Sequence, residues 1–147
     1  MKKFMNFVVL LFLPIQFGFC LGRTVSYNEL KQHYFASIES IKTCGNWNGN
    51  QQPGNFRVIK AFISGGEMLF VDIVTLGKNE ITVHYGFSFD ETNNDHLELE
   101  LDKINCLPDD DNKLTLNVSA KTNQNKLYKF MLKIDGLKKT YRYRLIP

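Results

Sequence analysis

The histidines of this chain are the side chains that could most readily act in catalysis or bind a metal. His33, His84 and His96 lack the spacing of zinc or other metal ligands, and strand alternation places His84 on a solvent-facing surface. The sequence contains no G-x-S-x-G, H-E-x-x-H or phosphate-loop motif. We therefore expect no catalytic residues, no metal and no cofactor, and interpret the protein as a non-enzyme.

The acidic run PDDDNK at 108–113 could indicate a calcium loop. A calcium loop starting at Asp109 would need a glycine at its sixth position and a carboxylate at its twelfth. Those positions hold Leu114 and Ala120, so the run is interpreted as an acidic turn.

Charge is distributed unevenly along the second half of the chain. Nine acidic residues lie between positions 90 and 111 with Lys103 as the only basic one, and eight basic residues lie between 121 and 144 with Asp135 as the only acidic one. These clusters could be two docking patches. We instead expect the charges to pair across neighbouring strands of one sheet.

The first 22 residues have the pattern of a signal peptide. Lys2 and Lys3 precede a short apolar run at 7–13, and cleavage is expected after Gly22. The apolar run is too short to span a bilayer of about 30 Å, so no stable membrane insertion is expected. We predict a secreted, extracellular protein whose single β-rich domain covers residues 23–147.

The cysteine count is consistent with secretion. Cys20 leaves with the signal peptide, and Cys44 and Cys106 remain as a pair expected to form a disulfide. Loss of Lys2 and Lys3 lowers the basic residues from 18 to 16 against 15 acidic ones, a net charge of +1. This nearly neutral balance does not indicate a nucleic-acid partner.

One amphipathic helix is predicted over residues 26–42. Ser26 and Glu29 form a capping box at its start, and apolar residues follow at spacings of three and four. This apolar stripe should face a sheet, and its members are Tyr27, Leu30, Tyr34, Ile38 and Ile41.

From about residue 56 to 146 the apolar period changes to two, as in EITVHYGFSF at 80–89. Alternation of this kind is typical of antiparallel strands with one buried face. Short turns, including DETNND at 90–95, predict an up-and-down meander of hairpins. We expect seven strands, or eight if the segment around Trp47 also pairs, in a mainly β fold that forms a closed or nearly closed barrel. The two strands at about 56–63 and 67–75 are apolar on both faces, so the helix should cover them.

The inward positions of the predicted strands are rich in aromatic residues. These side chains could line a cavity for a small apolar ligand, or they could fill a closed core. The candidate ligand-lining residues are Tyr85, Phe87, Phe89, Tyr128, Phe130, Tyr141 and Tyr143.

Asn117-Val118-Ser119 is an acceptor sequence for N-glycosylation. Alternation places Asn117 outward, as a glycan requires, so Asn117 is a candidate glycosylation site.

Gly45-Asn46-Trp47, after a helical lead and before an antiparallel meander, resembles the G-x-W motif of the lipocalin and calycin group. The resemblance implies a barrel closed at one end by Gly45 and Trp47. In lipocalins an arginine from the last strand packs against that tryptophan, and Arg142 or Arg144 is the candidate here.

Three functions are compatible with this pattern, and the third, a small hydrolase on an unfamiliar scaffold, is disfavoured because no catalytic residue can be named for it. The first is a secreted carrier or scavenger that holds a small apolar ligand in a lipocalin-like barrel. The alternative is a secreted effector, of the venom or saliva kind, that acts on an extracellular protein target through its surface. The oligomeric state is not determined by the sequence.

Overall fold

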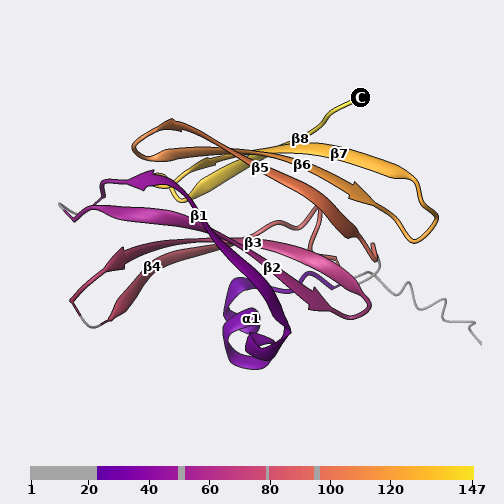
Figure 1. The fold of residues 1–147 in the computed structure, drawn as a ribbon, viewed down its shortest axis with the longest axis horizontal. Coiled ribbons are helices and arrows are strands. Elements are labelled where there is room, and N and C mark those ends of the chain that lie inside the picture. Colours follow the sequence, from indigo (N-terminus) through magenta and orange to yellow (C-terminus); the bar gives the residue numbers. More distant parts are fainter. Residues whose placement is uncertain (1–22, 50–51, 79, 95–96) are drawn as a thin grey trace, which may run out of the picture.

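The protein is described here from a computed structural model that covers residues 23–49, 52–78, 80–94 and 97–147. The expected signal peptide and His96 therefore lie outside the described residues. Two four-stranded antiparallel sheets stack face to face, and one helix covers the outer face of the first sheet (Figure 1). The expectation of a mainly β, antiparallel fold with one packed helix is confirmed.

Each sheet is a meander in chain order. The first sheet has the order β1-β2-β3-β4 and the second β5-β6-β7-β8. The bounds of the first four strands are β1 (Ile38–Trp47), β2 (Gly54–Ile63), β3 (Gly66–Leu76) and β4 (Ile81–Ser88). Those of the second four are β5 (Glu100–Asp110), β6 (Lys113–Lys121), β7 (Leu127–Asp135) and β8 (Thr140–Leu145). The segment around Trp47 pairs with β2, which makes eight strands.

The helix α1 (Tyr27–His33) is shorter than the predicted 26–42. Its start is as expected: the Glu29 backbone N–H donates to Ser26 Oγ at 3.2 Å, and the Ser26 backbone N–H donates to Glu29 Oε2 at 2.9 Å. A short 3-10 turn, η1 (Phe35–Ser37), then leads into β1.

Residues 38–42 were predicted as helix and form the first half of β1. Their apolar spacing fits a helix, but Ile38, Ile41 and Thr43 are β-branched and favour extended backbone. Pairing with β2, from Ile38 opposite Ala61 onward, also satisfies their backbone groups. Ile41 is 49% exposed and contributes nothing to the predicted stripe.

The helix covers the second face of β2 and β3, as their two apolar faces predicted. Tyr27 and Leu30 belong to one buried cluster with side chains from both strands. The strand members of this cluster are Ile59, Ala61, Ile63, Met68 and Phe70.

The two sheets are joined by the connection from Phe89 to Leu99, where a hairpin turn was predicted. Asn93 is fully buried, and its side chain accepts from Leu69 N–H at 2.9 Å and donates to Leu69 C=O at 2.6 Å. These are the backbone groups that an extension of β4 would have paired, so the side chain of Asn93 ends the strand there. The chain then crosses to the second sheet. β4 and β5 do not pair, and the described strands form two separate sheets without a closed barrel.

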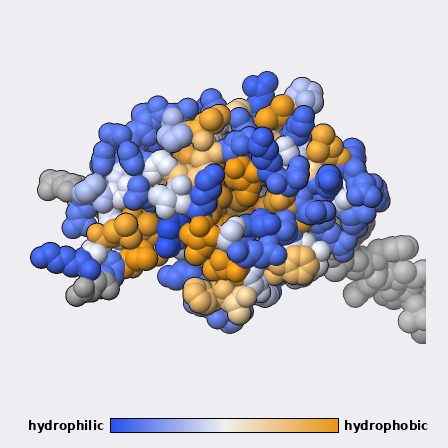
Figure 2. Space-filling model, in the orientation of Figure 1, coloured by the Kyte–Doolittle hydropathy of each residue, from blue (hydrophilic) through white to orange (hydrophobic). Residues whose placement is uncertain are grey.

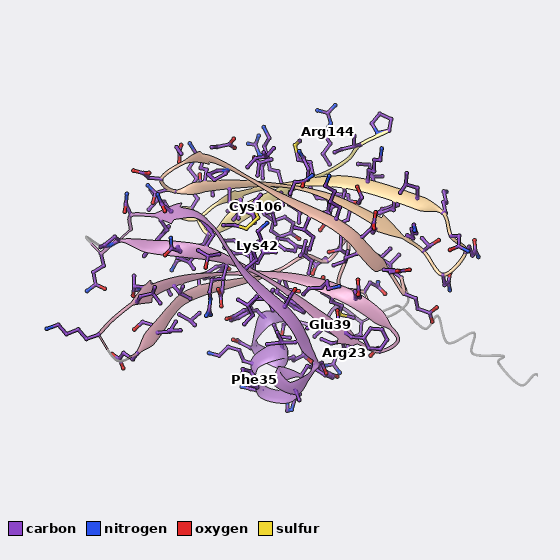
Figure 3. The ribbon with its side chains drawn as sticks, viewed as in Figure 1. Arg23, Phe35, Glu39, Lys42, Cys106 and Arg144 are labelled. Carbon is purple, nitrogen blue, oxygen red and sulfur yellow. A yellow bond between two sulfur atoms is a disulfide. The ribbon has the colours of Figure 1, made fainter. Side chains whose placement is uncertain are left out.

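The space between the sheets is filled by one apolar cluster. Phe56, Leu69, Leu116, Phe130 and Leu132 are each fully buried in it. The predicted disulfide, Cys44 to Cys106, joins edge strands β1 and β5 across this space with a Cα–Cα distance of 5.8 Å (Figure 3). One flank of the sandwich is therefore covalently closed.

Candidate binding site at the β4–β8 flank

The seven predicted ligand-lining residues gather at the flank opposite the disulfide. Tyr85 and Phe87 lie on β4 and Phe89 directly follows it; Tyr128 and Phe130 lie on β7, and Tyr141 and Tyr143 on β8. All seven belong to or pack against the core between the sheets. We call this set the aromatic flank.

Ring contacts connect the aromatic flank within and between the sheets. Across the sheets, Phe89 and Tyr141 have ring centroids 5.0 Å apart in an edge-to-face arrangement. Within β4 the Tyr85 and Phe87 rings are 4.8 Å apart, and in the second sheet the Phe130 and Tyr143 rings are 5.5 Å apart. Separations of this kind are favourable for aromatic pairs. The two sheets thus meet here through side chains, because no described backbone pairing joins β4 to β8.

The aromatic flank has an apolar floor and a polar rim. The rings of Phe87, Phe89 and Phe130 are buried, with exposures of 3%, 0% and 0%. The four tyrosines are half-buried, so each has one face in the core and one edge at the surface. An apolar floor with a few polar groups at its margin is typical of small-molecule sites.

The rim hydroxyls are organised by hydrogen bonds. Tyr143 donates to the Tyr128 hydroxyl at 2.9 Å, and Tyr141 donates to Glu91 Oε2 at 3.0 Å. The pKa of Tyr141 is raised to about 12, chiefly by burial; the backbone N–H of Asp90 opposes the rise and the bond to Glu91 adds to it. Burial, followed by the bond to Tyr128, also raises the pKa of Tyr143. These phenols remain neutral hydrogen-bonding groups at any physiological pH.

Trp47 closes one end of the sandwich, but its partner differs from the expected arginine. The tryptophan is 4% exposed and lies under the turn after β7, where Gly136 leaves room for its ring. The ring that stacks on it belongs to His84, with centroids 4.8 Å apart. Arg142 and Arg144 lie on the exposed outer face of β8, and Arg144 points away from the sandwich (Figure 3).

A β-bulge explains why His84 is not on the solvent face. The register between β3 and β4 shifts after Ile73, which pairs with Tyr85, while Val74 pairs with Val83. His84 is the extra residue, so strict alternation fails there. Its Nε2 lies 3.0 Å from the hydroxyl of Thr75.

Gly45 occupies a second irregularity, in β1. Its φ of +73° is a conformation that glycine adopts readily, and the pairing of β1 with β2 shifts between Thr43 and Asn46. The bulge lies directly after Cys44 and turns the chain toward Trp47.

Sequence reasoning missed a buried polar cluster beneath the helix. Asp72 is 0% exposed and accepts from the Tyr27 hydroxyl at 2.7 Å and from Arg57 Nε and Nη2 at 2.9 and 2.6 Å. Burial, then the bond to Asp72, raises the pKa of Tyr27, and the same carboxylate raises the pKa of Arg57. The only sequence signal was a charged residue within the apolar run of β3. All three groups are satisfied, so the cluster attaches the helix to the sheet.

The candidate glycosylation site lies in the middle of the second sheet. Asn117 is on central strand β6, on the outer face, and is half-buried. Its Oδ1 is buried without a hydrogen-bond partner. Glycosylation of Asn117 stays a prediction.

The described residues contain neither a cluster of metal-ligating side chains nor a membrane-spanning helix. No three His, Cys, Asp or Glu side chains within them gather closely enough to hold a metal ion. No helix among them has the length and apolar content needed to cross a membrane.

Comparisons with known proteins do not identify a relative. No protein-family model matches the chain, and no curated protein or solved structure matches it significantly. The resemblance to lipocalins therefore stays a hypothesis that rests on Gly45-Asn46-Trp47 and the meander.

Proposed function

We propose that this protein is a secreted, non-enzymatic binding protein that takes a small apolar ligand between its sheets at the aromatic flank. The observation that carries the proposal is the gathering of seven aromatic side chains from β4, β7 and β8 at one side of the sandwich. The structure has a sandwich of two sheets in place of the expected lipocalin-like barrel. In this proposal the ligand enters between the two sheets at the β4–β8 flank.

The two flanks differ in how they can move. At the β1–β5 flank the disulfide holds the sheets together. At the β4–β8 flank they are held by ring contacts and by bonds such as Tyr141 to Glu91. An apolar ligand could replace the contacts between these aromatic rings. This exchange would break no backbone hydrogen bonds between strands, because β4 and β8 do not pair. Separation of the sheets at this flank should therefore cost less free energy than separation at the β1–β5 flank.

A fluorescent fatty-acid probe tests the proposal, together with native mass spectrometry for apolar molecules that co-purify. We expect saturable binding that weakens at least about fivefold in Tyr143→Ala, because the ring forms part of the rim. Phe62→Ala is the matched control, since Phe62 is 52% exposed on β2 and away from the flank. If no probe binds and no apolar mass co-purifies, the carrier function must be abandoned.

A second function is favoured by the packing of the interior. The core side chains of both sheets are buried against one another, including Phe56, Leu116 and Leu132 at 0% exposure. A filled sandwich is suited to presenting its surface, and the alternative proposal is therefore a secreted effector that acts on an extracellular protein. A stoichiometric complex with a purified target, formed equally well by Tyr143→Ala, would support this function over the carrier.

A further inference from the structure

The outer face of the second sheet carries a concentration of positive charge. Lys129 and Lys133 project from β7 and Arg142 and Arg144 from β8, and all four are exposed. Lys103 lies in the same direction on β5. We call these five residues the basic face.

Strand register determines the spacing of these cations. Lys133 lies directly opposite Arg142, and Arg144 lies opposite Met131, which separates Lys129 from Lys133 along β7. Lys103 and Lys129 lie in one row across the sheet, with Ser119 between them. Directly opposite residues have Cβ atoms about 5 Å apart, and alternate residues of a strand are about 7 Å apart. The cations therefore form a spaced lattice across the sheet rather than a single cluster.

The charges of this lattice are not compensated within the protein. The sequence predicted that the acidic cluster at 90–111 and the basic cluster at 121–144 would pair across the sheet. In the part of the chain that the structure describes, no ion pair involves any residue of the basic face. The observed pairs of these segments are local, Lys113 with Asp110 and Lys138 with Asp135.

The remaining acidic groups of this outer face lie at its margins. They are Glu100 at one end, opposite Lys121, and Asp109 and Asp135 toward the other. Asp109 accepts from the Thr115 hydroxyl, and Asp135 accepts from the Lys138 backbone N–H. Asp109 therefore reaches the row of Lys133 and Arg142 through Thr115, whereas the rows of Lys129 and Arg144 contain no acidic residue.

Uncompensated cations at directly opposite positions destabilise a sheet. Positive residues are common on edge strands, where they prevent strand addition, and this could account for Arg142 and Arg144 on β8. It does not account for Lys129 and Lys133, because β7 is an interior strand between β6 and β8. The arrangement requires another explanation, and an anionic partner supplies one.

The side chains that lie between the cations limit which class of anionic partner could bind. The aromatic residues of β8 point into the core, so the basic face offers no stacking surface for the bases of a single-stranded nucleic acid. Its apolar side chains are Met131 and the exposed Leu107 and Leu127, which are separated from one another on the sheet, whereas membrane-surface binding needs a continuous buried apolar area. The other groups between the cations are the hydroxyl of Ser119 and the amides of Asn105 and Asn117.

From this lattice of cations with interleaved hydroxyls and amides, we propose that the basic face binds a sulfated polysaccharide. Sulfate groups pair with Lys and Arg, and the Asn and Ser side chains hydrogen-bond sugar hydroxyls. The cations extend over β5, β7 and β8, which suits an extended chain of repeated negative charges. This proposal concerns the opposite surface of the second sheet from the aromatic flank, and it does not depend on the apolar ligand.

The test uses heparin as the probe and protein made without a glycan, because a glycan on Asn117 would cover this face. We expect binding at physiological salt that weakens as salt rises. Lys133→Ala with Arg142→Ala should weaken it about tenfold and lower the slope of log K against log salt by about two. The matched control is Lys31→Ala with Lys42→Ala, which removes two exposed positive charges from α1 and β1. Unchanged unfolding midpoints show that both variants are folded.

Three results would overturn the proposal. The first is absence of heparin binding at physiological salt. The second is equal weakening in the control variant, which would assign the effect to net charge. The third is binding to vesicles containing phosphatidylserine with no binding to heparin, which would assign the face to a membrane surface.

Discussion

The buried cluster under the helix makes a quantitative prediction for Asp72→Asn. The substitution preserves the shape of the side chain but removes its charge. Arg57, whose side chain is 19% exposed, is then left without its counter-ion. Three hydrogen-bond donors faced the carboxylate, and one of them now faces the amide N–H₂ of the new side chain, which is itself a donor and cannot accept. Removal of one partner of a buried ion pair costs about 3–5 kcal/mol. Because Arg57 retains some contact with water, we expect a loss of about 3 kcal/mol.

The assay is urea unfolding at neutral pH, followed by the fluorescence of Trp47. This is the only tryptophan and is 4% exposed, so its emission reports on the opening of the sandwich. Small domains are stable by about 5–15 kcal/mol, so a loss of this size moves the midpoint well outside experimental error. Asp110→Asn is the control, since it removes an acid from an exposed ion pair with Lys113. Its midpoint should stay unchanged.

A compensating variant separates the ion pair from the shape of the site. Replacing the cluster with apolar groups, as Tyr27→Phe, Arg57→Met and Asp72→Leu together, leaves no buried charge unpaired and should recover most of the lost stability. The reasoning is refuted if Asp72→Asn loses less than about 1 kcal/mol, or if the triple variant is no more stable than Asp72→Asn.

Three further predictions concern other parts of the structure. Replacing Cys44 and Cys106 by alanine opens a loop with a sequence separation of 62, and urea unfolding should show a loss of about 4 kcal/mol; an unchanged midpoint contradicts the proposed closure of this flank. Gly86→Ala places a methyl group against the Tyr27 ring, and the helix should shift at a cost of about 1–3 kcal/mol; hydrogen exchange should increase in α1 and not in β6. The raised pKa of Tyr141, about 12 against about 10 for a free tyrosine, contributes stability that is complete below about pH 10 and is lost as pH rises toward 12. A titration of phenolate absorbance should show phenols that ionise late, and the late amplitude should fall by one tyrosine in Tyr141→Phe, since Tyr27 and Tyr143 also ionise late; an unchanged late amplitude in this variant contradicts the burial of the Tyr141 ring.

Local patterns were sufficient for much of the fold. The capping box at Ser26 and Glu29 predicted the start of α1 because it needs only residues three apart. Strict alternation predicted the buried faces of β6 and β7. The double apolar faces of β2 and β3 predicted that a helix would cover them, and the even pair Cys44 and Cys106 predicted the disulfide.

The errors occurred where a local pattern fits two structures or where a distant group decides. Residues 38–42 have helical spacing of apolar side chains, yet they pair with β2 and form a strand. The turn at 90–95 has hairpin composition, but the side chain of Asn93 binds the backbone of Leu69 and so ends the pairing of β4 with β3. The chain then continues into the second sheet instead of forming a hairpin. His84 was misplaced because the bulge in β4 depends on the register with β3.

The candidate sites show the same division. Alternation predicted all seven members of the aromatic flank as inward residues, because the period of a strand is a local property. It could not show that they meet at one side, since that depends on how the two sheets stack. Likewise, the sequence showed two clusters of opposite charge, but only the strand register showed that the cations of β7 and β8 share an outer face and lie opposite no acidic residue.

The sequence by itself therefore determined seven of the eight described strands, the faces of most of them, the helix start and the disulfide, because these depend on residue type, period and parity over a few neighbours. Only the tertiary structure decided that the meander divides into two sheets, that His84 stacks on Trp47, and that five cations of β5, β7 and β8 share one uncompensated face. Those outcomes depend on contacts between residues far apart in the chain. Their free energies are not encoded in any short segment.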